Sequence, residues 1–315
     1  MKHYTHIYLA AKAIDLLYQC VDNYYDASGN LIKGSKKSKK RKDCAKQQRI
    51  FKYYEDMTYE ASWAPDDILK DNAPNHIFKL FTDEEFPNHE LGARPSFNGN
   101  GVKFYNFNGA LPYRVDHLAK VIVDLSKLRD FNDQFTLKQI VYLYLLLSHY
   151  IADAYVPMHC DLRDDPPSGR NNYPSKSSKS GKPQGKYMKS SAHGYVEGLW
   201  EGAALEIIKQ EGMLDVSRIH KGNPEPELVG KTKIGLSDCA KDCEIKVVEI
   251  PSNGLMDYMI DVCIESKKRG QRLFPVIDPE NMNEAIFNDI SREIFTGCVS
   301  SLLSVWRHIW EATFS

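Results

Sequence analysis

Histidine and carboxylate side chains occur in the segment LLSHYIADAYVPMHC at a spacing that suits metal coordination. His149 and Asp153 are four residues apart, and in a helix two such side chains leave the same face one turn apart. Pro157 cannot continue that helix, so His159 is expected from the turn beyond it. The three side chains are therefore candidate ligands around a common point at the end of one rigid element.

A second pair with the same spacing, His193 and Glu197, lies in SSAHGYVEGLWE at the start of another predicted helix. Imidazole and carboxylate groups are ligands of zinc, so two such pairs indicate a metal-lined cleft between helices. One pair alone would more often be a surface ion pair. However, His149 and Asp153 lie inside the most apolar predicted helix, where an unpaired polar group is costly to bury. This placement favours a metal site.

The elements that must position these residues are helical. Apolar residues recur at helical spacing along most of the chain, and no long alternating run indicates a sheet. The clearest predicted helices cover residues 7–17, the central stretch 137–148 and a long C-terminal segment, 285–310. We therefore expect one all-α, multi-helical domain over residues 1–315, with a metal cluster at the base of a cleft between helices.

Three segments break the helical pattern. Residues 27–46 include seven basic residues from Lys33 to Lys42, and such a block is typically solvated and mobile. Residues 161–192 are rich in Pro, Gly, Ser and Lys, which is typical of a functional or disordered loop. Both segments are predicted to be flexible insertions. The third, residues 223–253, contains a short apolar run at 246–250 that is compatible with a small hairpin.

Composition excludes several classes of protein. The 315 residues are 42% hydrophobic and 26% charged, enough for a core without disulfide staples. Lys and Arg number 41 and Asp and Glu 42, so a formal charge of −1 leaves no attraction of the whole protein to nucleic acid or membrane. Seven irregularly spaced cysteines fit a reduced chain better than a disulfide framework. The longest apolar stretch, 140–156, is too short and too polar to span a bilayer.

A set of residues in the first two thirds of the chain resembles the bacterial zinc-dependent phospholipase C family. The same set is similar to the related single-strand-specific nucleases, which use a three-zinc cluster. The residues that carry the resemblance are, in chain order, His6 in HIYLAAKAIDLL, Asp66 in ASWAPDD, His76 in NHIFK, His149, Asp153, His159 and the pair His193 and Glu197. The resemblance spans about residues 1–200, and the ordered set is far more specific than any single motif.

The resemblance implies a site for up to three zinc ions. The implied ligands are Asp66, His76, His149 and Asp153 for the first zinc, His159, His193 and Glu197 with water for the second, and His6, a bridging Asp153 and Met1 for the third. In the family the N-terminal residue, normally a Trp, gives its amino nitrogen and carbonyl oxygen, and here Met1 stands in its place. Asp66 and Asp67 are adjacent, and the position after WAP favours Asp66.

The resemblance also implies an activity, zinc-dependent phosphodiester hydrolysis. A zinc-bound hydroxide would attack phosphorus, with Asp66 as the catalytic residue that orients it. Glu197 favours a phospholipase C-like enzyme that cleaves a phospholipid headgroup, because the nucleases usually have Asp there. We then expect a phospholipid or another phosphodiester as substrate, transient contact with a membrane surface and no obligate protein partner.

Two alternatives stay open at this point. One is a three-zinc nuclease acting on single-stranded DNA or RNA, which would need aromatic platforms and a groove for phosphates. The other is a non-catalytic zinc-binding protein. The sequence as it stands has no recognisable signal peptide and reads as cytoplasmic, whereas relatives of the resembling family are usually secreted.

Overall fold

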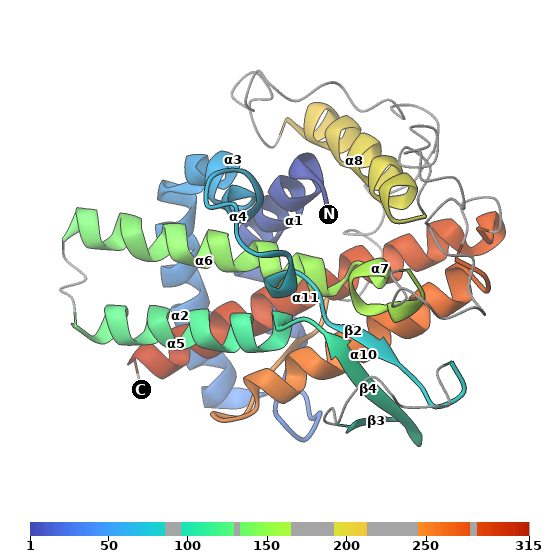
Figure 1. The fold of residues 1–315 in the computed structure, drawn as a ribbon. Helices are drawn as coiled ribbons and strands as arrows, with labels where there is room; N and C mark the ends of the chain where they lie inside the picture. Colours follow the sequence, from blue (N-terminus) through green and yellow to red (C-terminus); the bar gives the residue numbers. More distant parts are fainter. Residues whose placement is uncertain (86–95, 129–132, 165–191, 213–244, 278–281, 315) are drawn as a thin grey trace.

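A computed structural model describes residues 1–85, 96–128, 133–164, 192–212, 245–277 and 282–314. Helices predominate in this part of the chain, so the predicted all-α class is confirmed (Figure 1). Most of the predicted insertion at 161–192, and the stretch 213–244, lie outside the described residues. Among the described residues, none of the helices combines the length and the apolar character that crossing a bilayer requires.

The helices differ widely in length. The long ones are α1 (His3–Leu16), α2 (Gly34–Tyr53), α5 (Leu111–Leu128), α6 (Gln134–Ala154), α8 (Ala192–Glu211), α10 (Leu255–Leu273) and α11 (Glu284–Phe314). Single turns form α3 (Thr58–Ala61), α4 (Ala64–Asp67) and α7 (Pro157–Cys160), with 3-10 turns η1 (Gln19–Asn23), η2 (Glu55–Met57), η3 (Ala73–Asn75) and η4 (Leu162–Asp164). The three helices predicted most clearly from periodicity are confirmed as α1, α6 and α11.

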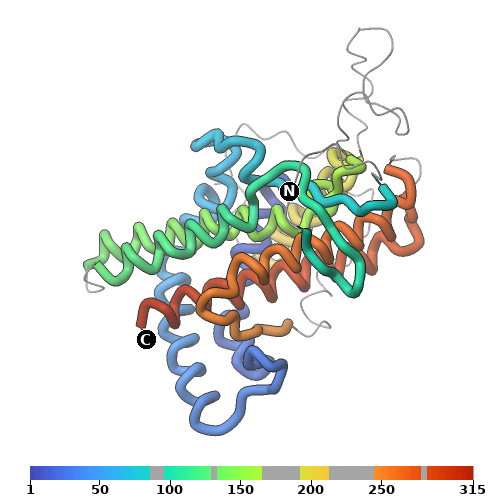
Figure 2. The backbone as a smooth tube through the Cα atoms, turned by 60° about the horizontal axis from the view of Figure 1, so that its bottom comes forward, coloured from blue at the N-terminus to red at the C-terminus, as the bar shows by residue number. Residues whose placement is uncertain are grey.

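The central helix is α6, which packs against α1, α5, α10 and α11 (Figures 1 and 2). Its first turn is capped by Asp133, whose carboxylate accepts hydrogen bonds from the backbone nitrogens of Phe135 and Thr136. It ends at Ala154, before Pro157, as the sequence predicts. The second half of α6 is almost entirely buried, so side chains there have a fixed environment.

The basic segment predicted to be a mobile insertion, 27–46, instead forms the first part of α2 from Gly34 onward. The prediction is wrong because one face of α2 is buried and its charges have partners distant in the sequence. The Lys40 ammonium lies 2.7 Å from Glu249 and 2.8 Å from Glu311, which belongs to α11. These ion pairs offset the mutual repulsion of the basic residues.

Two small sheets accompany the helices. Strands β2 (Lys79–Phe81), β4 (Val102–Asn108) and β3 (Ser96–Gly99) form an antiparallel sheet in that order, which the sequence did not predict because β2 and β3 are so short. Residues 223–244 of the segment in which a small hairpin was considered lie outside the described residues. In its described part, β5 (Val247–Val248) pairs in parallel with β1 (Tyr24–Tyr25). The β2 sheet matters for the site, because the Phe78 backbone nitrogen donates to the His159 carbonyl oxygen at 3.0 Å.

Candidate metal centre

The end of α6 places His149 and Asp153 on one face, as their spacing predicts. His149 Nε2 lies 3.1 Å from Asp153 Oδ2, and both residues are almost completely buried. The other ring nitrogen of His149, Nδ1, donates to the carbonyl oxygen of Ser62 at 3.1 Å. This hydrogen bond fixes the ring and directs Nε2 toward the centre, an arrangement typical of metal-binding histidines.

Asp66 and His76 join His149 in a first ligand group. His76 Nδ1 is 3.1 Å from His149 Nε2, and Asp66 Oδ1 lies 3.6 Å from the former and 3.5 Å from the latter. His76 Nδ1 is also 2.9 Å from Asp153 Oδ2. Ligand atoms of Asp66, His76 and His149 thus lie around one point. Of the two adjacent aspartates, Asp66 is therefore the one that belongs to this ligand group. Asp67 lies farther out and contacts His3 at 3.7 Å.

His159, His193 and Glu197 form a second ligand group. His159 Nε2 is 3.0 Å from His193 Nε2, and Glu197 Oε1 lies 3.0 Å from His193 Nε2 and 3.7 Å from His159 Nε2. His159 comes from α7, the turn that begins at Pro157, whereas the other two come from the first half of α8. The predicted pair His193 and Glu197 therefore meets His159 from a separate helix.

The N-terminus and His6 form a third group together with Asp153. The Met1 amino nitrogen lies 3.0 Å from Asp153 Oδ1 and 2.8 Å from Glu197 Oε1. His6 Nε2 donates to the Met1 carbonyl oxygen at 3.1 Å and lies 3.6 Å from Asp153 Oδ1. The His6 ring also stacks on the His149 ring, with 4.0 Å between centroids. His3 is not part of this group, because it stacks on Trp63 instead.

Asp153 connects the three groups. Its Oδ2 faces His76 and His149, whereas its Oδ1 faces Met1, His6 and His159, the last at 3.5 Å. A carboxylate with its two oxygens turned to different ligand groups is suited to bridge two cations.

The protonation states of the carboxylates fit a cationic centre. Burial alone would raise the pKa of Asp153, but the Met1 amine and His149 outweigh it and hold that pKa well below its usual value. The pKa of Glu197 is low for the same reason, with the Met1 amine and His193 as its main partners. Both side chains are therefore ionised at neutral pH and available as ligands.

His6, His149 and His159 have clearly shifted pKa values. Burial lowers the pKa of His6 and of His159 well below the usual value, so both rings are neutral. For His149 burial also acts downward, but Asp153 and Asp66 raise its pKa to about 9. The Met1 amine behaves similarly, with Asp153 and Glu197 raising its pKa to about 11 against the effect of burial. In the protein without metal, the His149 ring and the Met1 amine are therefore protonated at neutral pH. Their positive charges lie where a cation would bind.

The chemistry of the donor set supports the fit of a metal ion. The ring nitrogens that face the Asp153 carboxylate include His6 Nε2, His76 Nδ1 and His149 Nε2. Imidazole nitrogens together with carboxylate oxygens are the donors that zinc and similar divalent cations bind. The side chains of Asp66 and His193, 42% and 32% exposed, give the otherwise buried centre its contact with solvent.

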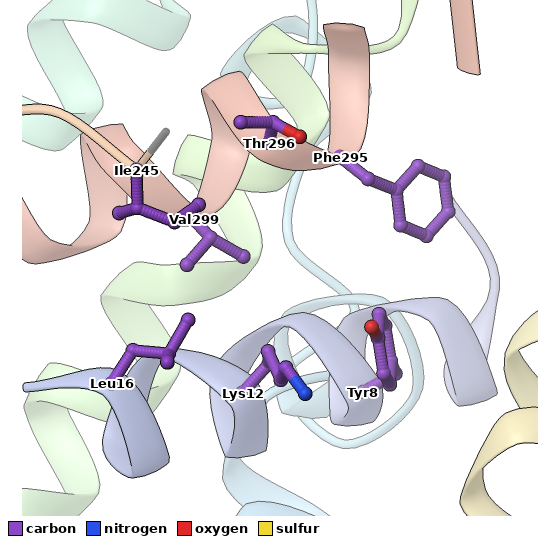
Figure 3. A pocket seen from close by; sticks show the side chains of 7 residues that line it. All are labelled: Tyr8, Lys12, Leu16, Ile245, Phe295, Thr296 and Val299. Carbon is purple, nitrogen blue, oxygen red and sulfur yellow. The ribbon is translucent and has the colours of Figure 1, made fainter. Parts of the chain in front are cut away.

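Two pockets lie away from this centre. A small one between α1 and α11 is lined by Tyr8, Lys12, Leu16, Ile245, Phe295, Thr296 and Val299 (Figure 3). A larger one of about 380 Å³ lies among α5, α10 and α11, where Ala119, Leu255 and Ile309 line it. None of the candidate ligands lines either pocket.

Sequence reasoning missed two groups that support the centre. One is the Ser62 carbonyl oxygen, for which the sequence holds no signal. The other is Glu201, whose carboxylate contacts the first turn of α1 and which follows Glu197 by one helical turn. The spacing of the two glutamates could have drawn attention to it.

Comparison of the chain with family models, curated proteins and solved structures found no significant match. The function proposed below therefore rests on the geometry of the ligand groups and on the sequence motifs.

Proposed function

We propose that this protein is a zinc-dependent phosphodiesterase. The observation that carries the proposal is the convergence of three ligand groups on Asp153, from residues as far apart in the chain as Met1 and Glu197. A surface ion pair would need only two of these residues. The number of buried imidazole and carboxylate groups at one place is what a multinuclear metal site requires.

The charges of such a centre favour a phosphate ligand. Three zinc ions would bring +6, and the carboxylates of Asp66, Asp153 and Glu197 bring −3, so with neutral imidazoles the sum is +3. When bound, zinc supplies hydroxide near neutral pH by lowering the pKa of water to about 7, and it offsets negative charge on a phosphoryl group. The protein provides the ligands and excludes bulk water from the buried side.

Asp66 is the residue that we assign to the reacting water. Its Oδ1 faces His76 and His149, whereas the side chain as a whole is 42% exposed. It is therefore the carboxylate of the centre that a solvent molecule and a substrate can reach together. A hydrogen bond from water to its outer oxygen would orient the water toward a bound phosphodiester.

A phospholipid-like substrate is our preferred choice, on the basis of Glu197 at the position where the resembling nucleases usually have Asp. The outer face of α2 would suit an anionic bilayer, since Lys39, Lys42, Lys46 and Arg49 are all exposed there. A phospholipid surface would be the partner, and contact with it would be transient. The same exposed basic residues could contact the phosphates of a nucleic-acid backbone, so a single-strand nuclease remains the second candidate.

Hydrolysis assays separate these functions. The purified protein, loaded with zinc, is tested against a chromogenic choline phosphodiester and against single-stranded DNA, each with and without chelator. We expect chelator-sensitive cleavage of the choline ester, and cleavage of DNA alone would favour the nuclease. Zinc binding without cleavage of any phosphodiester would indicate a non-catalytic zinc protein.

A matched pair of histidine variants ties the activity to the centre. His149→Ala should lose zinc and activity together, whereas His117→Ala, an exposed histidine on α5, should keep both. Retention of zinc and activity in His149→Ala would contradict the assignment.

A further inference from the structure

The first turn of α1 has no acceptor of its own for its backbone N–H groups. Lys2 occupies the position before the helix and makes no side-chain capping hydrogen bond, and the first turn contains no acidic residue. Helix N-terminal N–H groups that are buried need a partner, because an unpaired one costs free energy. For Tyr4 and Thr5 the partner comes from another helix.

That partner is Glu201 on α8. Its Oε1 accepts from the Tyr4 backbone nitrogen at 2.9 Å, and its Oε2 accepts from the Thr5 backbone nitrogen and from Thr5 Oγ1, both at 3.1 Å. Glu201 is only 5% exposed, and Thr5 is fully buried. Burial raises the pKa of Glu201 to about 7, whereas the hydrogen bonds from Tyr4 and Thr5 and the helix dipole favour its ionised form.

Glu201 acts next to the metal centre rather than in it. It follows Glu197 by one turn of α8, so the two carboxylates leave the same face, toward α1. Glu197 contacts the Met1 amine at 2.8 Å, and Glu201 contacts Tyr4 and Thr5. Figure 1 shows the start of α1 beside α8, where these contacts lie. The first five residues are thus held at two points by one rigid helix.

The position of His6 depends on the same two contacts of α8 with the N-terminal residues. Its backbone nitrogen donates to the Lys2 carbonyl oxygen at 3.1 Å, and its ring Nε2 donates to the Met1 carbonyl oxygen at 3.1 Å. If the first turn of α1 shifts or frays, the Met1 amine, the Met1 carbonyl and the His6 ring move together. These are the groups that distinguish the third ligand group from the other two.

We propose that Glu201 is a positioning residue that holds Met1 and His6 in place for the third cation. The inference rests on the proposed metal centre but not on phosphodiester hydrolysis. Glu201 itself does not touch the candidate ligand atoms, so its effect passes through the first turn of α1.

Glu201→Gln tests this with little change in size. The amide keeps one acceptor oxygen but replaces the other by an NH₂ group, which cannot accept from the Tyr4 or Thr5 nitrogen. Changes in groups that support metal ligands typically weaken metal binding 10–100-fold. We expect a loss of this size for one zinc equivalent, with the remaining equivalents unchanged.

The experiment compares the wild type, Glu201→Gln and Glu206→Gln, the last a half-exposed glutamate on the same helix. Zinc affinity and stoichiometry are measured by titration of metal-free protein with zinc. In parallel, the metal-free proteins are treated with an amine-reactive label, and modification of the Met1 amine is followed by mass spectrometry. We expect Glu201→Gln to lose one tight zinc equivalent. We also expect it to be labelled faster than the wild type at Met1. Glu206→Gln should match the wild type in both measurements.

Two results would overturn the proposal. One is wild-type zinc stoichiometry and Met1 labelling in Glu201→Gln, and the other is equal weakening of all zinc equivalents. If Glu201→Gln fails to fold, Thr5→Val, which removes only the hydroxyl donor, replaces it, and the same two readouts should change in the same direction. If the wild type binds no zinc, the proposed function fails, whereas the labelling comparison still tests the positioning role.

Discussion

Asp153 and Met1 lie 152 residues apart in the chain, yet Asp153 Oδ1 is 3.0 Å from the Met1 amino nitrogen. The contact exists because α1 and α6 pack side by side, so that the start of one meets the end of the other. The opposite oxygen of Asp153 faces His76 and His149. One carboxylate therefore links the N-terminal group to the first ligand group.

Asp153→Asn should cost the protein at least two zinc equivalents. The amide is nearly the same size but carries no charge, and its NH₂ group cannot bind a cation, so cations in the two ligand groups that Asp153 faces would both be held more weakly. Metal analysis after dialysis measures the effect. Asp164→Asn, another buried aspartate but outside the ligand groups, serves as the control and should keep its zinc. Full zinc content in Asp153→Asn would show that the carboxylate does not bridge.

The adjacent aspartates Asp66 and Asp67 should differ sharply when each is changed to Asn. Asp66 faces His76 and His149, whereas Asp67 is 58% exposed and contacts His3. We expect Asp66→Asn to lower kcat by at least about 100-fold, the usual contribution of a group that handles the proton of the nucleophile. Asp67→Asn should stay within about twofold of the wild type. Equal effects of the two changes would contradict the proposal that Asp66 orients the reacting water.

Metal binding should release protons, and zinc affinity should rise with pH between 7 and 9. The pKa of His149 is raised to about 9 in the metal-free protein, so at pH 7 its ring is protonated and must lose that proton before it can bind zinc. The Met1 amine, with a pKa near 11, adds to the release. Calorimetry in two buffers of different ionisation enthalpy counts the protons. A heat that is independent of the buffer would contradict these protonation states.

Gly270→Ala should disturb the turn that carries His159. A methyl group at Gly270 of α10 would lie 2.9 Å from Pro157 Cβ, so α7 would have to move. The clash costs about 1–3 kcal/mol, more than the gain of about 1 kcal/mol in helix propensity. We expect a net loss of about 1 kcal/mol in chemical denaturation, together with weaker binding of one zinc equivalent. A variant as stable as the wild type with unchanged zinc binding would argue against tight packing there.

The parts of the centre that follow local rules were predictable from the sequence. His149 and Asp153, and likewise His193 and Glu197, are one helical turn apart, and the helix geometry alone places each pair on one face. Pro157 marks the end of α6 for an equally local reason. The convergence of these pairs with His6, Asp66 and His76 was expected only through the family resemblance.

The parts that depend on contacts distant in the sequence were not predictable. From the sequence alone, the basic segment of α2 is predicted to be a solvated block. The structure shows instead that Lys40 pairs with Glu249 and Glu311. The spacing of Glu201 from Glu197 is visible in the sequence, but the contact of Glu201 with the first turn of α1 is not. In both cases the partner lies about 200 residues away or more, and no pattern in one sequence links such positions.

The zinc content of the purified protein with a free Met1 amine tests the central claim most directly. Metal analysis and native mass spectrometry, after loading with zinc and removal of the excess, give the number of ions per chain. The three ligand groups predict three zinc ions per chain. A protein that remains folded but retains no zinc would contradict the account.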